Sequence, residues 1–221
     1  VLRTQPAEVY DDWTTNAMPF NDARDVAAIE DFGCFARNDA FVSGGAGALA
    51  STYCRDSPKA LCEAPAQGSL HRQASFVPAF FPEGIEFGED VDFFYFPSYA
   101  SKDLGNPVLG GGTLMSITNP SGATTELMKF FQLPLAHEVM MAQTGFLTPL
   151  KSVNPEAYLN DALRGQGDIL VNATTFRFDG SDLMPGGVGA GSFWTGMVDY
   201  TGGKDAQAVA DDIQASWDAL K

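Results

Sequence analysis

Apolar side chains recur every three or four positions near both ends of the chain, which is the spacing of one helix face. Asn21 or Asp22 can cap the first of these helices, and Asp205 can cap the second. The apolar positions on the two expected faces are Val26, Ile29 and Phe32, followed by Val209, Ile213, Trp217 and Leu220. We interpret both stripes as core faces, so that Trp217 has a structural role.

The middle of the chain has the pattern of strands. The aromatic run "VDFFYFP" at 91–97, bounded by acids and a proline, predicts a short buried strand. The run "PVLGGGTLMSIT" at 107–118 predicts a second strand, interrupted by glycines at 110–112. Glycine inside a strand often marks a bulge, a crossing point or the close approach of a ligand.

Four more helices are expected in the second half of the chain. Two lie near 121–132 and 135–143, separated by Pro134, and two lie near 155–163 and 166–174. The stretch at 145–155 between the pairs predicts a loop. Strands and helices intermix, so the fold class is α/β or α+β, without internal repeats or low-complexity linkers.

The net charge of the chain limits the kinds of partner that it can bind. The chain has 221 residues and a formal net charge of −15, whereas nucleic acids and anionic membranes attract clustered Lys and Arg. The balance therefore argues against both kinds of partner.

No stretch approaches the ~18 apolar residues of a membrane span, and no signal-like segment stands at Val1. We expect a cytosolic protein or one whose leader has been removed, and the abrupt start also fits a larger N-terminal truncation.

Three cysteines, Cys34, Cys54 and Cys62, are too few for a disulfide framework. Cys54 and Cys62 lie in a loop-like stretch and are a candidate disulfide in an oxidising compartment, with buried free thiols as the alternative. Their spacing does not match common structural zinc sites. Histidine is the other usual zinc ligand, and the chain has only two histidines. No metal site is expected.

A glycine-rich stretch at 178–200, "FDGSDLMPGGVGAGSFWTGMVDY", resembles three catalytic or nucleotide motifs only superficially. A phosphate loop needs Gly-Lys-Ser/Thr after its glycines, whereas Phe193 and Trp194 follow here. No apolar strand leads into it as a dinucleotide fingerprint requires, and the chain contains no Gly-x-Ser-x-Gly elbow. What remains is a Trp at a helix start that presents a flat face to a sugar ring, or two aromatic residues that both point into the core.

The other titratable candidates favour structural roles. We interpret His137 as a surface histidine or a core histidine with its hydrogen bonds satisfied. Glu83, Glu86 and Glu89 have the residue type of a glycosidase pair, but acids are plentiful throughout the chain, so a solvated loop is favoured.

Several stretches, in this order, resemble extracellular solute-binding proteins of ABC sugar importers. They are "PFND" at 19–22, "LHRQASFVPAFFPEG", "DVDFFYFP", "PVLGGGTLM", "FRFDGSDLMPGGVGAGSFWTGMVDY" and "GGKDAQAVADDIQASW". The chain is most similar to the α-glucoside-binding branch of the maltose-binding-like family, over nearly its whole length. Each motif is weak alone and specific in combination.

The resemblance implies an α/β protein of the periplasmic-binding-protein-like kind, type II and maltose-binding-like, whose two lobes close on a sugar. Members of the family are longer, so the chain corresponds to their C-terminal half. Residues 1–108 are expected to be the first part of the C-terminal lobe. Residues 109–155 are expected to be the hinge crossing and a segment of the N-terminal lobe, and 156–221 the last helices of the C-terminal lobe.

The resemblance also implies a ligand site. Trp194 matches a stacking aromatic, Arg72 and Gln73 are expected to donate hydrogen bonds to hydroxyls, and Phe76 gives a second apolar face. Asp182 accepts from a hydroxyl or caps the following helix. The maltose-binding branch has a Trp in the 71–76 loop that this chain lacks, so subsite geometry differs. The full expected set is His71, Arg72, Gln73, Phe76, Gly111, Gly112, Thr113, Asp182 and Trp194.

On this interpretation the protein is a carbohydrate-binding protein and not an enzyme, without a cofactor, exported to the periplasm or exterior. Its partners are a small carbohydrate, an ABC transporter permease and a complementary N-terminal fragment. Two alternatives stay open. One is a glycoside-acting enzyme that uses acids of the 83–92 loop. The other is a lobe fragment without a ligand, because half a cleft buries too little of a sugar.

Overall fold

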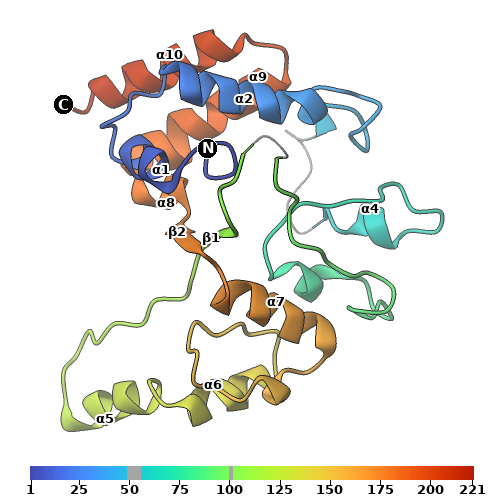
Figure 1. The fold of residues 1–221 in the computed structure, drawn as a ribbon, viewed down its shortest axis with the longest axis vertical. Coiled ribbons are helices and arrows are strands. Elements are labelled where there is room, and N and C mark those ends of the chain that lie inside the picture. The colour runs from blue at the N-terminus through green and yellow to red at the C-terminus, as the bar shows by residue number, and fades with distance from the viewer. Residues whose placement is uncertain (49–55, 100–101) are drawn as a thin grey trace.

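The computed structural model describes residues 1–48, 56–99 and 102–221. One end of the molecule consists of helices α1, α2, α8, α9 and α10, and the other end carries α5 and α6 (Figure 1). Helix α7 and a pair of short strands lie between the two ends. The main helices are α1 (Ala7–Thr14), α2 (Ala23–Ala36), α5 (Gly122–Phe130), α6 (Pro134–Met141), α7 (Asp161–Val171), α9 (Trp194–Thr201) and α10 (Ala206–Asp218).

The short elements are helices α4 (Lys59–Cys62) and α8 (Gly180–Leu183), strands β1 (Pro107–Gly110) and β2 (Thr175–Phe178), and 3-10 turns at Val77–Phe80 and Pro155–Ala157. A π-helix, Gly187–Phe193, leads directly into α9. Helices and a parallel strand pair therefore share one chain, and the expected α/β class is confirmed at this level.

The two helices expected near the chain ends are confirmed, together with their caps. The Asp22 side chain accepts a hydrogen bond from the Arg24 amide, and Asp205 accepts one from the Ala208 amide. These contacts satisfy amides that have no partner inside the helix. Only Asp22, of the two residues expected to cap α2, takes this role.

The apolar stripes are confirmed except at one position in each. Val209, Ile213 and Trp217 are buried, as are Ile29 and, in part, Val26. Phe32 is exposed and stacks edge-on against Phe35. Leu220 is also exposed, because α10 ends at Asp218 before the stripe reaches it.

An aromatic cluster forms the centre of the larger core. Trp13 lies 5.4 Å from Tyr10, 5.3 Å from Phe20 and 5.6 Å from Phe193, measured between ring centroids. Phe20 also contacts Trp217 of α10. Tilted and edge-on pairs of this kind add to the stabilisation that comes from buried area alone. Residues from both ends of the sequence therefore build one core.

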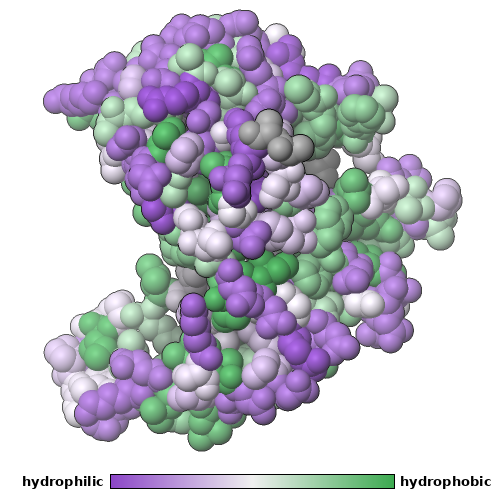
Figure 2. Space-filling view, viewed as in Figure 1, coloured by the Kyte–Doolittle hydropathy of each residue, from purple (hydrophilic) through white to green (hydrophobic). Residues whose placement is uncertain are grey.

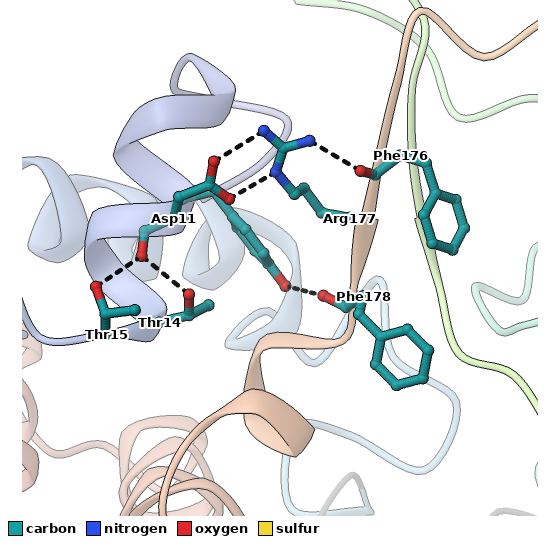
Figure 3. Close-up of polar contacts among 7 residues, drawn as sticks. Asp11, Thr14, Thr15, Phe176, Arg177 and Phe178 are labelled. Atoms are coloured by element: carbon teal, nitrogen blue, oxygen red, sulfur yellow. Dashed lines mark hydrogen bonds and ion pairs between the residues drawn. The ribbon is translucent and has the colours of Figure 1, made fainter. Parts of the chain in front are cut away.

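Strands β1 and β2 run parallel, with Pro107 opposite Thr175 and Gly110 opposite Phe178. The chain leaves β1 toward α5 and leaves β2 toward α8, so the pair lies where the two ends of the molecule join (Figure 1). Helix α1 holds β2 in place through Tyr10, whose hydroxyl donates to the Phe178 carbonyl at 2.8 Å, and through an ion pair between Asp11 and Arg177 (Figure 3).

The expected strand at 91–97 is wrong. Side chains there alternate between partly buried Val91, Phe93 and Tyr95 and exposed residues between them. The segment has no ladder partner among the described residues, apart from one isolated bridge between Phe87 and Val91. The expected strand at 107–118 is right only for its first four residues.

The helices expected near 121–132 and 135–143 are confirmed as α5 and α6, and 145–155 is a loop apart from the turn beginning at Pro155. The pair expected at 155–163 and 166–174 is wrong, because one helix, α7, spans most of that range. Its interior glycines are places where aromatic rings pack: a Cβ on Gly165 would lie 2.9 Å from the Phe93 ring, and one on Gly167 would lie 2.6 Å from the Tyr158 hydroxyl. Strand β2 was not predicted.

A smaller core forms between α6, α7 and the segment that joins them, around Met141, Tyr158 and Leu163. His137 lies at its edge with both ring nitrogens in hydrogen bonds. Nε2 lies 2.9 Å from the Phe131 carbonyl, and Nδ1 lies 2.7 Å from the hydroxyl of buried Thr148. His137 is therefore a core histidine with its hydrogen bonds satisfied, as predicted.

Candidate functional site

Trp194 is the first residue of α9, and its side chain is 69% exposed. The residue before it points the other way: Phe193 packs edge-on against Trp13 and also contacts Phe20. The alternative in which both aromatic residues point into the core is therefore wrong for Trp194 and right for Phe193. A large flat apolar face with this exposure is suited to stacking against a ring of a ligand.

The glycine run before Trp194 serves two different purposes. A Cβ on Gly189 would lie 1.9 Å from the Ser181 carbonyl oxygen, so this glycine lets the π-helix pack directly on the backbone of α8. Buried Val188 holds the same turn against the core. At Gly186 and Gly187, in contrast, an added Cβ would have no neighbouring atom within 4 Å, so both positions face open space. These two glycines leave room for a ligand near the run.

The 71–76 loop lies outside helices and strands. His71 is half-buried, its Nε2 lies 3.0 Å from the Ser57 hydroxyl, and burial lowers its pKa. Arg72 and Gln73 are exposed, and Gln73 accepts a hydrogen bond from the next amide, that of Ala74. Phe76 is half exposed and lies edge-on to Phe80. The loop therefore presents two polar side chains and one aromatic face to solvent.

Gly111, Gly112 and Thr113 follow β1 directly and are all exposed. A Cβ on Gly111 would have no neighbour within 4 Å, and one on Gly112 would meet only the Phe178 ring at 3.9 Å. Gly110, in contrast, is required by packing, since a Cβ there would lie 2.5 Å from the Phe176 ring. The backbone after β1 is thus open to a ligand at 111–113.

Asp182 is exposed in the first turn of α8. The cap of α8 is Asp179, whose side chain accepts from the Ser181 amide. The π-helix that follows has no side-chain cap, so the capping role considered for Asp182 is not what the structure has. Its carboxylate faces solvent.

Among the described residues, no hydrogen bond, ion pair or ring contact joins Trp194, the 71–76 loop and the 111–113 backbone. Two shallow hollows of about 240 and 180 Å³ are lined by other residues. The larger lies where the start of α1 meets Pro107 and Thr175, and the smaller lies between 116–119 and α5.

The sequence-based interpretation missed the contacts that position β2. Asp11 and Tyr10 on α1 hold Arg177 and the Phe178 carbonyl (Figure 3), across a separation of more than 160 residues. The only sequence signal for this pair is the presence of opposite charges, which is common in any chain. The contacts position backbone and contribute no group that faces a ligand.

The described ranges 1–48, 56–99 and 102–221 offer little support for a metal site or a membrane-spanning helix. They contain no cluster of three or more His, Cys, Asp or Glu side chains that could hold a metal ion. No helix in them is long and apolar enough to cross a membrane. Glu83, Glu86 and Glu89 are exposed, as expected for a solvated loop. Cys54 lies outside these ranges, so the candidate disulfide with Cys62 stays a prediction.

Two curated relatives show what the chain is similar to. It is 61% identical, over its full length, to the alpha-glucosides-binding periplasmic protein AglE of Rhizobium meliloti, of which it covers 48%. It is 36% identical to the osmoprotective compounds-binding protein GgtB of Synechocystis sp., over 98% of the chain and 51% of that protein. The chain therefore spans about half the length of the curated relatives it matches.

The resemblance to the α-glucoside-binding branch of these solute-binding proteins is confirmed by the two relatives. Both relatives are named as binding proteins. No protein-family model and no solved structure matches the chain.

Proposed function

We propose that this chain is the C-terminal half of a periplasmic solute-binding protein that takes up a small α-glucoside and delivers it to the permease of an ABC importer. The observation that carries the proposal is Trp194, a 69% exposed ring at the start of α9 in a chain 61% identical to an α-glucoside-binding protein. A pyranose ring has C–H faces that suit such a platform.

The other expected site residues carry the types of chemical group that a sugar can contact. Arg72 and Gln73 supply hydrogen-bond donors for hydroxyls, Phe76 supplies a second apolar face, and Asp182 supplies an acceptor. The open backbone at 111–113 adds amide and carbonyl groups. Sites for small polar ligands combine apolar walls with a few placed polar groups in this way.

The architecture proposed with this function is the type II, maltose-binding-like fold. Residues 1–108 and 156–221 would belong to the C-terminal lobe, and 109–155 to the hinge crossing and the N-terminal lobe. The β1–β2 pair is the natural crossing in this scheme, because the chain continues from the two strands toward opposite ends of the molecule (Figure 1). Closure of two such lobes would bring these groups onto one ligand.

The proposal is tested by calorimetric titration of the full-length protein with α-linked disaccharides and, as an alternative ligand class, with glycine betaine. We expect a disaccharide to bind and Trp194→Ala to weaken its binding about five- to thirtyfold, in line with the ~1–2 kcal/mol of an aromatic platform. Phe41→Ala is the matched control, since Phe41 is equally exposed at 68% but lies outside the proposed site. Unchanged affinity in the Trp194 variant would overturn the platform, and turnover of the glycoside would favour the enzyme.

A further inference from the structure

Phe176 of β2 is a large apolar side chain that is 43% exposed. Successive side chains of a strand point to opposite faces, so Phe176 and Phe178 share one face of the strand pair and Arg177 lies on the other. Figure 3 shows both rings on the side of β2 away from α1, whereas Arg177 points toward α1 and pairs with Asp11. One face of the strand pair is therefore tied to α1, and the other presents aromatic surface.

The Phe176 ring lies directly against the backbone of the neighbouring strand. A Cβ on Gly110 would lie 2.5 Å from Cε2 and 2.7 Å from Cζ of this ring, so glycine leaves the room that the ring occupies. This contact restricts the movement of the ring, while much of the side chain stays accessible. An aromatic ring that is already fixed loses little conformational entropy when a ligand stacks on it.

The backbone after Gly110 supplies polar groups beside the two rings. Within the described part of the chain, the amides and carbonyls of 111–113 make no backbone hydrogen bond, and all three residues are exposed. A Cβ on Gly112 would lie 3.9 Å from the Phe178 ring, so this backbone runs next to the aromatic face. Figure 2 shows the molecule narrowed on one side between its two ends, at the level where Figure 1 draws the strand pair. Apolar walls with a few polar groups are typical of sites for small polar ligands.

The charges around the strand pair favour an uncharged ligand. Residues 104–125, which include β1 and the open backbone, contain no charged side chain. Of the charged residues that β2 brings close, Arg177 pairs with Asp11, and Asp179 caps α8. An ionic ligand would lose hydration here without meeting a counter-charge from 104–125, whereas a sugar hydroxyl needs only a hydrogen-bond partner.

We propose that Phe176 is a specificity-determining residue of the ligand site, a second aromatic platform on which the C–H face of one ring of an α-glucoside stacks. Gly110 is the positioning residue that holds its ring. Together with Trp194, Phe176 gives a ligand of two rings two stacking surfaces, so a disaccharide is preferred over a monosaccharide glucoside. The identity of the ligand rests on the proposed function, whereas the role of Phe176 rests on the geometry of the strand pair.

The test is calorimetric titration of the full-length protein with maltose, sucrose and trehalose, and with methyl α-glucoside for comparison. Phe176→Leu keeps an apolar side chain but removes the flat ring, and it should weaken disaccharide binding about fivefold or more. Phe176→Tyr keeps the ring and should bind within about twofold of the parent protein. Phe130→Leu is the matched control, because Phe130 of α5 is also 43% exposed, and it should leave the affinity unchanged. The preference for a disaccharide over methyl α-glucoside should shrink in Phe176→Leu alone.

A second measurement tests the role of Gly110. The Cβ of Gly110→Ala would displace the Phe176 ring, so this variant should weaken disaccharide binding in the parent protein but hardly at all in a Phe176→Leu background. Gly122→Ala is the control, since a Cβ there has no neighbour within 4 Å. Thermal unfolding of each variant without sugar separates a loss of affinity from a loss of fold.

Three results would overturn the proposal. The first is parent-like affinity in Phe176→Leu, and the second is a lower unfolding midpoint of the ligand-free Phe176→Leu variant with unchanged affinity, which would mean that polypeptide covers the ring. The third is glycine betaine as the ligand whose binding Phe176→Leu weakens. If Trp194→Ala weakens the disaccharide and Phe176→Leu does not, this proposal fails and the proposed function stands. If the parent protein binds no disaccharide, both fail.

Discussion

Arg177 of β2 and Asp11 of α1 form a bidentate ion pair, with Nε 2.6 Å from Oδ1 and Nη2 2.8 Å from Oδ2. The Arg177 Nη1 also donates to the Phe176 carbonyl, so the guanidinium is held at three points (Figure 3). Two parallel hydrogen bonds fix both distance and orientation. The pair thus ties α1 to the strand through which the chain enters the helical end of the molecule.

We predict that Arg177→Met lowers the free energy of unfolding by about 1 kcal/mol. Both side chains are partly exposed, so solvent screens the attraction and the bidentate geometry supplies most of the effect. Urea denaturation of Arg177→Met, Asp11→Asn and the double variant measures the coupling free energy between the two side chains. Lys129→Met, which breaks an exposed pair within one helix, is the control and should cost about 0.3 kcal/mol. A coupling no larger than in that control would contradict the prediction.

Gly189→Ala should destabilise the fold by more than about 3 kcal/mol or prevent folding. The added Cβ would lie 1.9 Å from the Ser181 carbonyl oxygen, and two backbone segments would have to separate to relieve the contact. Gly187→Ala is the matched control, because that position faces open space, and it should change stability by less than about 1 kcal/mol. Thermal unfolding followed by circular dichroism separates the two. Equal midpoints for both variants would show that the close packing is not required.

The pH dependence of stability should include a contribution from Asp25. This carboxyl is buried on α2, and its desolvation raises the pKa from 3.8 to about 7. Because the folded-state pKa is above the unfolded value, the folded protein binds more protons between pH 4 and 7. The contribution is therefore fully present below about pH 4 and is lost as pH rises toward 7.

Asp25→Asn should accordingly be more stable than the parent chain at pH 7, by roughly 2–4 kcal/mol. The gain should shrink as the pH is lowered toward 4. Denaturant titrations of both proteins at several pH values give the difference directly. A difference that stays constant with pH would mean that the carboxyl titrates alike in the folded and unfolded chain.

Thr148→Val should cost about 1–3 kcal/mol, whereas Thr148→Ser should cost much less. Since the Phe131 carbonyl can only accept, Nε2 of His137 carries a proton, and Nδ1 lies 2.7 Å from the Thr148 hydroxyl. That hydroxyl in turn accepts from the Leu150 amide at 3.0 Å. Valine removes both bonds inside the smaller core. Chemical denaturation checks the cost, and nitrogen NMR of His137 reports the tautomer in each variant.

A further pH effect concerns His71 in the 71–76 loop. Burial lowers its pKa below the ordinary value of 6.5, so the neutral ring is favoured in the folded protein. Stability from this group is present above pH 6.5 and is lost as pH falls through the folded-state pKa. His71→Gln should flatten that part of the stability profile. Proton NMR titration of the ring would contradict the prediction if its midpoint lay at or above 6.5.

Some features followed from the sequence because their causes are local. Asp22 and Asp205 cap helices by bonding amides within three residues, and the stripe from Val209 to Trp217 needs only the helical period. The aromatic run at 91–97 favours a strand, but its local pattern is not sufficient. Whether a strand forms there depends on a partner, and no local pattern specifies one.

Glycine shows where local reasoning reached its limit. The sequence pattern predicted two helices that part between residues 163 and 166, whereas α7 continues through Gly165, on which Phe93 packs, and Gly167, on which Tyr158 packs. The glycines before Trp194 do not share one role. Gly189 makes room for the backbone of Ser181, while Gly186 and Gly187 are open. A glycine in a sequence indicates close approach but not what approaches.

The sequence by itself determined the end helices and their caps, the absence of phosphate-loop and hydrolase motifs, and the resemblance to sugar-binding proteins. Each of these depends on residues close together in the chain. Only the tertiary structure decided that Phe193 is partly buried against Trp13 while Trp194 is exposed, and that Asp11 meets Arg177. These features depend on contacts between segments far apart in sequence, and the solvent exposure of a side chain is fixed by the segments that cover it.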